Sequence, residues 1–592
     1  MARYKKKTNY DNVVKRRFTI FLVVLVSLFS VVFVKLVKVM ILDNKKYNES
    51  LVALTSTQVT LSSSPRGRIL DRNYNVIVDN KASKSIVYKK KKNIKNSEMI
   101  SLAYEVGPHI TLDLSKLTMR SKKEFFLAKY PDICNKKVTD YERELVKQRK
   151  MTNRELEELK IKRITDEDLS IFQEEDLKVA YLFYLMNKGY TYEEKTIKSD
   201  VSDSEYAYIS ENNDKLEGFD TRLDWERVYP YGDVMKTILG TVSSTSSGLP
   251  KEEKDYYLEK GYALNERVGL SYLEKEYEEY LHGERSIYEV VNSNELRLVK
   301  EGSRGKDIVL TIDINLQIEV EKAIREQITR AKGEYNTEYY DHSSVIIQDP
   351  NTGEILAMAS KRIVNGNIVD NTNNILISPI MPGSVVKGAS MLVGYNTGAI
   401  KIGDYMVDEC ITVAGTPTKC SSVTLGYIND ITALAKSSNV YQFKTAIRVN
   451  GQEYYYGMKL NFNQKSFDIY RNMYHSFGLG VKTGIDLPIE SSGYTSKDVA
   501  AGNLLDFVMG QYETYTPIQL SQYISTIANS GKRIQPHLLK EVHDSTYGDE
   551  VGETIYTYET KVLNTVPTEE AYMNRVKEDV TEIVMNVKSL EI

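Results

Sequence analysis

The chain has 592 residues, of which 41% are hydrophobic and 27% charged; this composition is ordinary for globular proteins, and the length is too great for one hydrophobic core, so several domains are expected. A net charge of −3 gives no global electrostatic case for nucleic-acid binding. Three cysteines are too few for a disulfide framework, and six histidines without a His-Glu-x-x-His or Cys-x-x-Cys pattern predict neither a metal site nor a cofactor.

The N-terminal stretch indicates a membrane anchor. Lysines and arginines gather in residues 1–17, and residues 18–34 carry no charged side chain. If Lys35 extends to the interface, the apolar run continues to Leu42 and offers roughly 20 residues or more, enough to span a bilayer. A cleaved signal peptide is the alternative, but no small-x-small cleavage site follows. The sequence therefore predicts a cytoplasmic tail at 1–17, one transmembrane helix at 18–42 and an extracytoplasmic remainder.

Residues 43–310 are expected to form a mixed α/β region outside the membrane. Residues 52–60 alternate as a strand does, and Pro65 to Asn73 concentrate Arg, Asp and Gly in a way that predicts a buttressing salt-bridge loop. Residues 89–220 are highly charged and include helical patterns, for instance at 153–190. We assign no chemistry to this region.

A second α/β domain is predicted from residue 311 onward. Val309 to Asp313 is expected to be a strand, and Asn315 to Ala331 an amphipathic helix. Residues 344–348 and 354–360 are strand-like and flank a turn signal, which predicts a hairpin. This helix and hairpin predict an α/β domain in which later helices pack on a sheet.

The octapeptide from Met381 to Gly388 is the strongest candidate for chemistry. A mostly small or apolar run from Val385 to Tyr395 predicts a buried helix with Ser384 at its N-terminus. Ser384 and Lys387 then share one helix face, where a lysine kept neutral by burial can take the serine proton. The alternative is a plain helix N-cap. The same spacing at Ser303 and Lys306 lies in a charged loop, and we interpret that pair as structural.

Residues Leu434 to Tyr441 form a short polar break inside an otherwise helical stretch. Such a break can aim a hydroxyl and an amide, those of Ser437 and Asn439, into a cleft. The alternative is a helix-capping turn.

Cys410 and Cys420 flank Gly415-Thr416-Pro417, which is a turn signal. A hairpin there would bring the two cysteines together. Their disulfide is a hypothesis that requires a domain outside the cytoplasm, and free thiols are the alternative.

Several stretches agree in type and order with one family. They are the anchor, Arg66-Gly67-Arg68-Ile69 with Asp71-Arg72, Arg227 with Tyr229-Pro230, Thr311-Ile312-Asp313 with Gln317, Asp349-Pro350 with Thr352 to Ser360, Pro382 to Lys387, Ser437-Ser438-Asn439, Thr483 to Pro488, and Thr516 to Gln519. With Ser-x-x-Lys followed by Ser-x-Asn, the chain resembles a class B penicillin-binding protein, a monofunctional peptidoglycan D,D-transpeptidase, of the elongation type found in low-GC Gram-positive bacteria. Residues 90–200 match least.

The resemblance implies a multidomain α/β fold. Its parts are the transmembrane helix, an elongated pedestal like the family's dimerisation domain at 43–310, and a penicillin-binding transpeptidase domain at 311–592 with helices on both sides of a sheet. It also implies that Ser384 attacks a stem peptide ending in D-Ala-D-Ala, that Lys387 is its base, that Ser437 relays the proton, and that Asn439 holds the substrate amide and orients Lys387. β-Lactams mimic D-Ala-D-Ala and would acylate Ser384.

The family carries a third motif, Lys-Thr/Ser-Gly, on the edge strand that faces the serine. Lys482-Thr483-Gly484 matches it in letters, but Asp486 and Pro488 follow so closely that an edge strand is disfavoured, and we interpret the stretch as a structural turn. The motif is expected after a helix at Thr516 to Asn529, yet the sequence ends after a helix predicted at Glu569 to Val587. The transpeptidase domain is therefore expected to be C-terminally incomplete, as a fragment or as a native truncation.

Two other functions stay open. A catalytically inactive scaffold would bind a membrane glycosyltransferase of the SEDS type and elongation-complex proteins; the missing third motif favours it, and the intact serine and lysine motifs oppose it. A β-lactam sensor or hydrolase would need a deacylating base, and no residue in the sequence supplies one. Acceptor chemistry, oligomeric state and the choice between elongation and division stay open as well.

Overall fold

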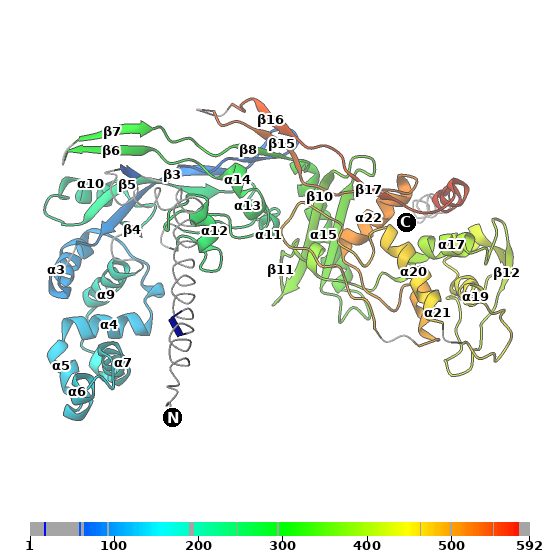
Figure 1. Cartoon of the computed structure of the whole chain (residues 1–592), viewed down its shortest axis with the longest axis horizontal. Coiled ribbons are helices and arrows are strands. Elements are labelled where there is room, and N and C mark those ends of the chain that lie inside the picture. Colours follow the sequence, from blue (N-terminus) through cyan, green and yellow to red (C-terminus); the bar gives the residue numbers. More distant parts are fainter. Residues whose placement is uncertain are drawn as a thin grey trace, which may run out of the picture. The chain divides into compact units, whose positions relative to one another are not determined.

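The structure is a computed structural model, and it describes residues 17–18, 58–60, 64–91, 94–188, 194–244, 247–292, 295–461, 463–497, 500–546, 548 and 550–578 (Figure 1). The chain divides into two compact units, residues 1–62 with 285–302, and residues 63–284 with 303–592. The predicted tail and anchor lie outside the described residues except for 17 and 18. Within the described ranges, no helix has the length and apolar character that a membrane crossing needs.

The first unit contains a three-stranded antiparallel sheet in the order β1-β6-β7. β6 (Ile287–Asn292) and β7 (Glu295–Lys300) form a hairpin, and β1 (Gln58–Thr60) pairs with the outer edge of β6. The strand predicted at 52–60 is thus present over Gln58–Thr60, and its first part lies outside the described residues.

The second unit is built on a sheet that joins sequence from its two ends. The strands run in the order β16-β15-β8-β2-β3-β4, with β5 also paired to β3. Their bounds are β2 (Ile69–Leu70), β3 (Val76–Lys89), β4 (Glu194–Lys198), β5 (Phe219–Val228), β8 (Asp307–Leu310), β15 (Leu539–His543) and β16 (Thr554–Thr557). The strand predicted at Val309 to Asp313 ends three residues early, because Asp313 instead caps the next helix by accepting from Asn315 N and Leu316 N.

Helices cover β3 and β4 in the N-terminal half of this unit. α3 and α9 pack their apolar residues against Ile86 and Tyr88 of β3. The helices here are α3 (Asn96–Val106), α4 (Met119–Lys129), α5 (Pro131–Lys136), α6 (Asp140–Lys147), α7 (Asn153–Arg163), α8 (Asp166–Leu169), α9 (Glu174–Asn187), α10 (Asp203–Glu211), α11 (Lys236–Leu239), α12 (Lys254–Glu259), α13 (Tyr272–Glu276) and α14 (Glu278–Leu281). The helical patterns predicted at 153–190 are confirmed as α7, α8 and α9.

The predicted salt-bridge loop is confirmed around Arg66 and Arg68. Arg66 Nε lies 2.8 Å from Glu274 Oε2, and Arg68 Nη2 lies 2.7 Å from Asp307 Oδ2, with all four side chains buried. Gly67 between them has no room for a side chain, because a Cβ would lie 1.8 Å from Lys306 O. Removing one partner of such a buried ion pair lowers the free energy of unfolding by about 3–5 kcal/mol. These pairs therefore hold the loop in place next to β2 and β8.

A second, three-stranded sheet carries the C-terminal half, in the order β11-β10-β9. β9 (His342–Gln348) and β10 (Ile355–Val364) form the predicted hairpin, and β11 (Asn367–Asp370) adds an edge. Successive residues of β10 are buried, so both of its faces are covered. Ala359 packs with α15 (Ile314–Lys332), the helix predicted at 315–331, and Met358 lies in one core with α22 (Pro517–Ala528).

A helical core encloses α17 (Lys387–Asn396), whose residues from Lys387 to Tyr395 are all buried. Each fully buried Leu, Val or Met side chain in it contributes about 1.5–3 kcal/mol. The remaining elements are α16 (Asn374–Ile377), α18 (Asp430–Ala435), α19 (Asn439–Val449), α20 (Gln464–Ser476), α21 (Asn503–Val508), β12 (Tyr405–Asp408), β13 (Gly426–Asn429), β14 (Lys532–Ile534) and β17 (Val562–Thr565). The helix predicted at Glu569 to Val587 is present over 570–578, and its remainder lies outside the described residues.

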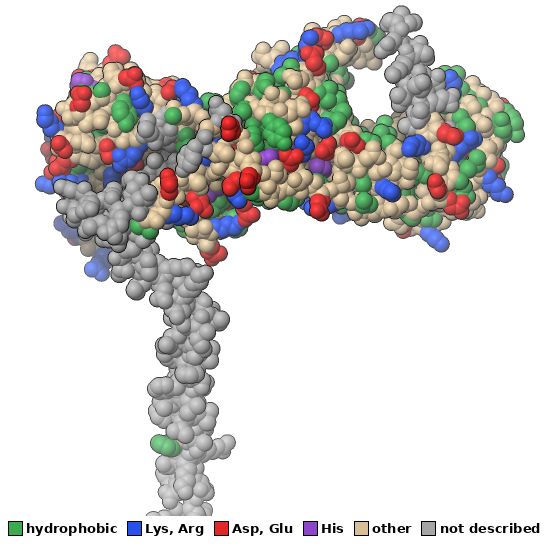
Figure 2. All heavy atoms as spheres, turned by 90° about the horizontal axis from the view of Figure 1, so that it is seen from above, with side chains coloured by type: hydrophobic (Ala, Val, Ile, Leu, Met, Phe, Trp, Pro, Cys, Tyr) green, Lys and Arg blue, Asp and Glu red, His purple; other side chains and the backbone are tan. Residues whose placement is uncertain are grey.

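Basic and acidic side chains are interspersed on the face that Figure 2 presents. This mixture matches the small net charge of −3.

Candidate functional site

Ser384 lies in a tight turn that leads directly into α17. The α-helix begins at Lys387 and not at Val385 as predicted, because Gly383–Val386 form a 3₁₀ turn in which Lys387 N–H donates to Ser384 O. Gly383 has a φ of +56°, and its N–H donates to Gly510 O over 3.0 Å. Gly510 must be glycine for this approach, since a Cβ would lie 2.0 Å from Gly383 O. The turn leaves the Ser384 side chain exposed.

Lys387 brings two of the other predicted site residues together. Its side chain is 1% exposed, and its Nζ donates to Ser437 O over 2.7 Å, Ser437 Oγ over 3.0 Å and Asn439 Oδ1 over 2.6 Å. Ser384 precedes it by one helical turn, and no hydrogen bond between Ser384 Oγ and Lys387 Nζ occurs in the described part of the chain. Three of the four predicted residues therefore make direct contact, and the fourth adjoins them.

Burial lowers the pKa of Lys387 from 10.5 to about 8, and Asp408 opposes the shift by favouring the charged amine. A lysine with this pKa is unprotonated in roughly a tenth of molecules at pH 7, a far larger fraction than for a lysine with the ordinary pKa. Such a lysine can accept a proton from a nearby hydroxyl, which an ordinary surface lysine cannot.

The polar break predicted between Leu434 and Tyr441 separates α18 from α19. Ser437 takes a left-handed backbone conformation with a φ of +56°, and Ser438 Oγ accepts from Tyr441 N over 3.0 Å as the N-cap of α19. The break caps a helix, as one interpretation held. The hydroxyl of Ser437 and the amide of Asn439, which the other interpretation singled out, both contact Lys387, and their catalytic role stays a prediction.

Cys410 and Cys420 form the hypothesised disulfide, and Ile411 and Lys419 pair between them as a hairpin. No pattern in the sequence indicated that Asn439 Nδ2 donates to Cys420 O over 3.2 Å. The sequence also did not reveal Asp408, whose bond to Ser438 Oγ joins residues 30 apart in the chain. No local pattern marks such a contact, because it depends on the tertiary fold.

The Lys482-Thr483-Gly484 stretch is irregular backbone and not a strand, in agreement with the prediction that no edge strand forms here. Thr483 is buried, and its backbone N–H donates to Glu490 Oε1 over 2.6 Å. Arg533 Nη2 donates to Lys482 O over 2.8 Å, so the backbone here is tied to the core while the Lys482 side chain is exposed.

Replacing Lys482 by alanine is expected to change the free energy of unfolding by less than about 0.5 kcal/mol, because its side chain is exposed. Covalent reaction with a fluorescent penicillin is expected to stay within about twofold of wild type, as for a surface change remote from the chemistry. Denaturant melts and labelling time courses measure both. A loss of labelling from a stably folded variant would reverse our interpretation of this stretch as structural.

Comparisons with known proteins give one consistent result. Residues 61–310 match the family described as "Penicillin-binding Protein dimerisation domain", and residues 343–588 match "Penicillin binding protein transpeptidase domain". The chain is similar to penicillin-binding protein 2A of Bacillus subtilis, with 41% identity over 87% of this chain and 74% of that protein.

Two solved structures extend the likeness to the fold. One is penicillin-binding protein 2B of Streptococcus pneumoniae strain 5204, with a TM-score of 0.71, 30% identity, and coverage of 89% of this chain and 86% of that one. The other is titled "Structural coordination of polymerization and crosslinking by a peptidoglycan synthase complex", with a TM-score of 0.53, 20% identity, and coverage of 96% and 84%. The second likeness concerns the fold alone.

Proposed function

Since the chain belongs to the class B penicillin-binding proteins, and is thus a peptidoglycan D,D-transpeptidase and a β-lactam target, we propose that Ser384 forms its acyl-enzyme. Ser384 Oγ attacks the carbonyl of the penultimate D-Ala in a stem peptide, and a C–O bond forms. The C–N bond to the terminal D-Ala breaks, and that residue leaves as the free amino acid. An amine on a neighbouring stem then attacks the ester, which makes the cross-link and frees Ser384.

The observation that carries this proposal is the environment of Lys387. Its lowered pKa suits it to take the Ser384 proton, and its contact with Ser437 Oγ provides a path by which that proton reaches the leaving amine. Asn439 accepts from Lys387 through Oδ1 and so keeps the amine pointed into the turn. The N-terminal turn of α17 adds backbone N–H groups, including that of Ser384, beside the developing oxyanion.

This function goes with two domains outside the membrane, a pedestal over 43–310 and a transpeptidase domain over 311–592. The family matches at 61–310 and 343–588 support these boundaries. In this proposal, residues 18–42 span the cell membrane once, with residues 1–17 in the cytoplasm. The uncharged run at 18–34 supports the anchor, and the disulfide supports an oxidising compartment outside the cytoplasm for the catalytic domain.

A membrane glycosyltransferase that polymerises glycan strands, of the SEDS type, is the partner we propose for the pedestal. The solved complex of similar fold is titled for the coordination of polymerisation and cross-linking in that protein, and its fold covers 96% of this chain. Elongation-complex proteins would bind at the same membrane surface. Co-purification of the full chain with such a glycosyltransferase from detergent extracts tests this part.

The transpeptidase chemistry is tested with the full chain in detergent, a synthetic stem pentapeptide ending in D-Ala-D-Ala, and a D-amino acid as acceptor. We expect release of free D-alanine in step with formation of the exchanged peptide. Asn439→Ala is expected to lower this rate about 100-fold, because an oriented hydrogen-bonding group at the reacting centre is lost. Lys436→Ala, which changes an exposed neighbour, is the matched control. A folded chain that releases no D-alanine would support the scaffold function instead.

A further inference from the structure

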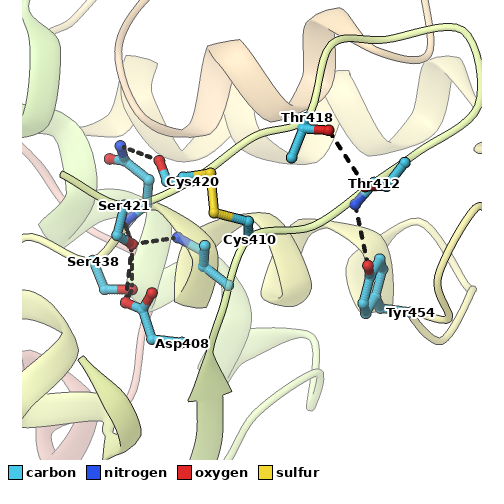
Figure 3. Close-up of a disulfide and its surroundings, with 10 residues drawn as sticks. Asp408, Cys410, Thr412, Thr418, Cys420, Ser421, Ser438 and Tyr454 are labelled. Atoms are coloured by element: carbon cyan, nitrogen blue, oxygen red, sulfur yellow. Dashed lines mark hydrogen bonds between the residues drawn. A yellow bond between two sulfur atoms is a disulfide. The ribbon is translucent and has the colours of Figure 1, made fainter. Parts of the chain in front are cut away.

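A hairpin outside the serine and lysine motifs lies against the Ser437–Asn439 turn. It runs from Asp408, at the end of β12, through the Cys410–Cys420 disulfide to Ser421 (Figure 3). Asp408 is 2% exposed, and its Oδ2 accepts from Ser438 Oγ over 2.6 Å and from Ser421 Oγ over 2.9 Å. One buried carboxylate thus holds a hydroxyl from each side of the contact.

Because both hydroxyls donate to Asp408, their lone pairs are left for the first N–H groups of α19. Ser421 Oγ accepts from Asn439 N over 3.0 Å and from Val440 N over 3.2 Å, and Ser438 Oγ accepts from Tyr441 N over 3.0 Å. A negative charge at a helix N-terminus is favourable in addition to these bonds. The start of α19, where Asn439 sits, is therefore held through Asp408.

The same hairpin sets which way the Asn439 amide points. Its Nδ2 donates to Cys420 O, so its Oδ1 is directed to Lys387 Nζ. The disulfide and the Ile411–Lys419 pair fasten the two arms of the hairpin to each other. A shift of this hairpin would therefore move Asn439 and the carbonyl of Ser437 away from Lys387.

We propose that Asp408, with its hairpin clamped by the Cys410–Cys420 disulfide, is a positioning residue that holds the Ser437–Asn439 turn against Lys387 for acyl transfer. This inference rests on the proposed acylation of Ser384. Asp408 is also the charged group that opposes the burial-induced fall in the pKa of Lys387. Asp408 therefore contributes in two ways that the pH dependence of acylation distinguishes. Its positioning of the turn affects the plateau rate constant, and its charge affects the midpoint of the pH profile.

The test measures the second-order rate constant for acylation of the full chain by a fluorescent penicillin as a function of pH. Asp408→Asn is expected to lower the plateau rate constant by up to about 100-fold, the cost of a misplaced reacting group. It is also expected to move the midpoint of the profile to lower pH, because the negative charge that favoured protonated Lys387 is gone. Ser421→Ala keeps the charge, so it is expected to lower the plateau without moving the midpoint.

Asp404→Asn is the matched control. Asp404 directly precedes β12, and among the described residues its carboxylate accepts one hydrogen bond, from Lys401 N. Replacing Cys410 and Cys420 together by serine is expected to lower the plateau less than Asp408→Asn does, since the hydrogen bonds to Asp408 persist. Circular dichroism and melting temperature report whether each variant folds.

A folded Asp408→Asn variant with the wild-type plateau and midpoint would overturn the inference. If that variant does not fold, Ser421→Ala decides: a lowered plateau supports the inference, and a wild-type plateau overturns it. Labelling of the wild-type chain distinguishes a failure of the proposed function from a failure of this inference. A wild-type chain that takes no label overturns the proposed function together with this inference, whereas a labelled wild type with unaffected variants overturns the inference alone.

Discussion

Replacing Ser384 by alanine is expected to abolish the covalent adduct that the full chain forms with penicillin. The adduct is an ester through a serine hydroxyl, so removal of the nucleophilic oxygen leaves no bond to form. Ser384 is exposed at the start of the turn before α17, and its loss removes no hydrogen bond found among the described residues. The variant is therefore expected to fold normally. Intact-protein mass spectrometry after incubation with penicillin measures the adduct.

The control for this experiment is Ser303→Ala. Ser303 and Lys306 repeat the Ser-x-x-Lys spacing, but they lie in the segment before β8, apart from the Ser437–Asn439 turn. This variant is expected to be labelled like wild type. If a folded Ser384→Ala protein still gained the mass of one penicillin molecule, the nucleophile would have to be another residue.

Replacing Lys387 by methionine is expected to lower the rate of acylation about 1000-fold, the size of effect that a positioned general base produces. Methionine keeps most of the volume of the buried side chain, so packing in α17 changes little. Lys436→Met is the control at an exposed lysine beside Ser437. A Lys387→Met protein that reacts as fast as wild type would remove Lys387 from the chemistry.

The pH dependence of wild-type acylation tests the same assignment without a substitution. Burial lowers the pKa of Lys387 to about 8, and the unprotonated amine is the form that accepts a proton. The rate is therefore expected to rise through pH 8 and then level off, and to fall about tenfold for each unit well below the midpoint. A rate that is flat between pH 6 and 9 would contradict the role of Lys387 as the base.

The sequence was sufficient for those parts of the site that depend on local order. Ser384 and Lys387 are three residues apart at the start of one helix, and a break between two helices carries Ser437 and Asn439, so local patterns predicted each pair separately. That Asn439 meets Lys387 was implied only by the resemblance to the family. The hairpin of β9 and β10 and the helices α15 and α22 also follow local patterns of alternation and capping. That no strand forms at Lys482 was predicted because Asp486 and Pro488 disfavour one.

Long-range contacts were beyond the sequence. β8 lies between β2 and β15, and β15 comes more than two hundred residues later, so no window of sequence predicts the pairing. Asp408 was missed for the same reason, since its partners Ser421 and Ser438 become neighbours only when β12 and α19 pack. The start of α17 was predicted two residues early, because a 3₁₀ turn and an α-helix have the same signal in the sequence.

The measurement that tests the central claim most directly is the location of the penicillin adduct on the wild-type full chain. The protein is incubated with penicillin, digested, and its peptides are sequenced by tandem mass spectrometry. We predict one adduct, on Ser384, in the peptide that also contains Lys387. An adduct on another serine, or none on a protein that is folded by circular dichroism, would contradict the assignment of Ser384 as the acylated nucleophile.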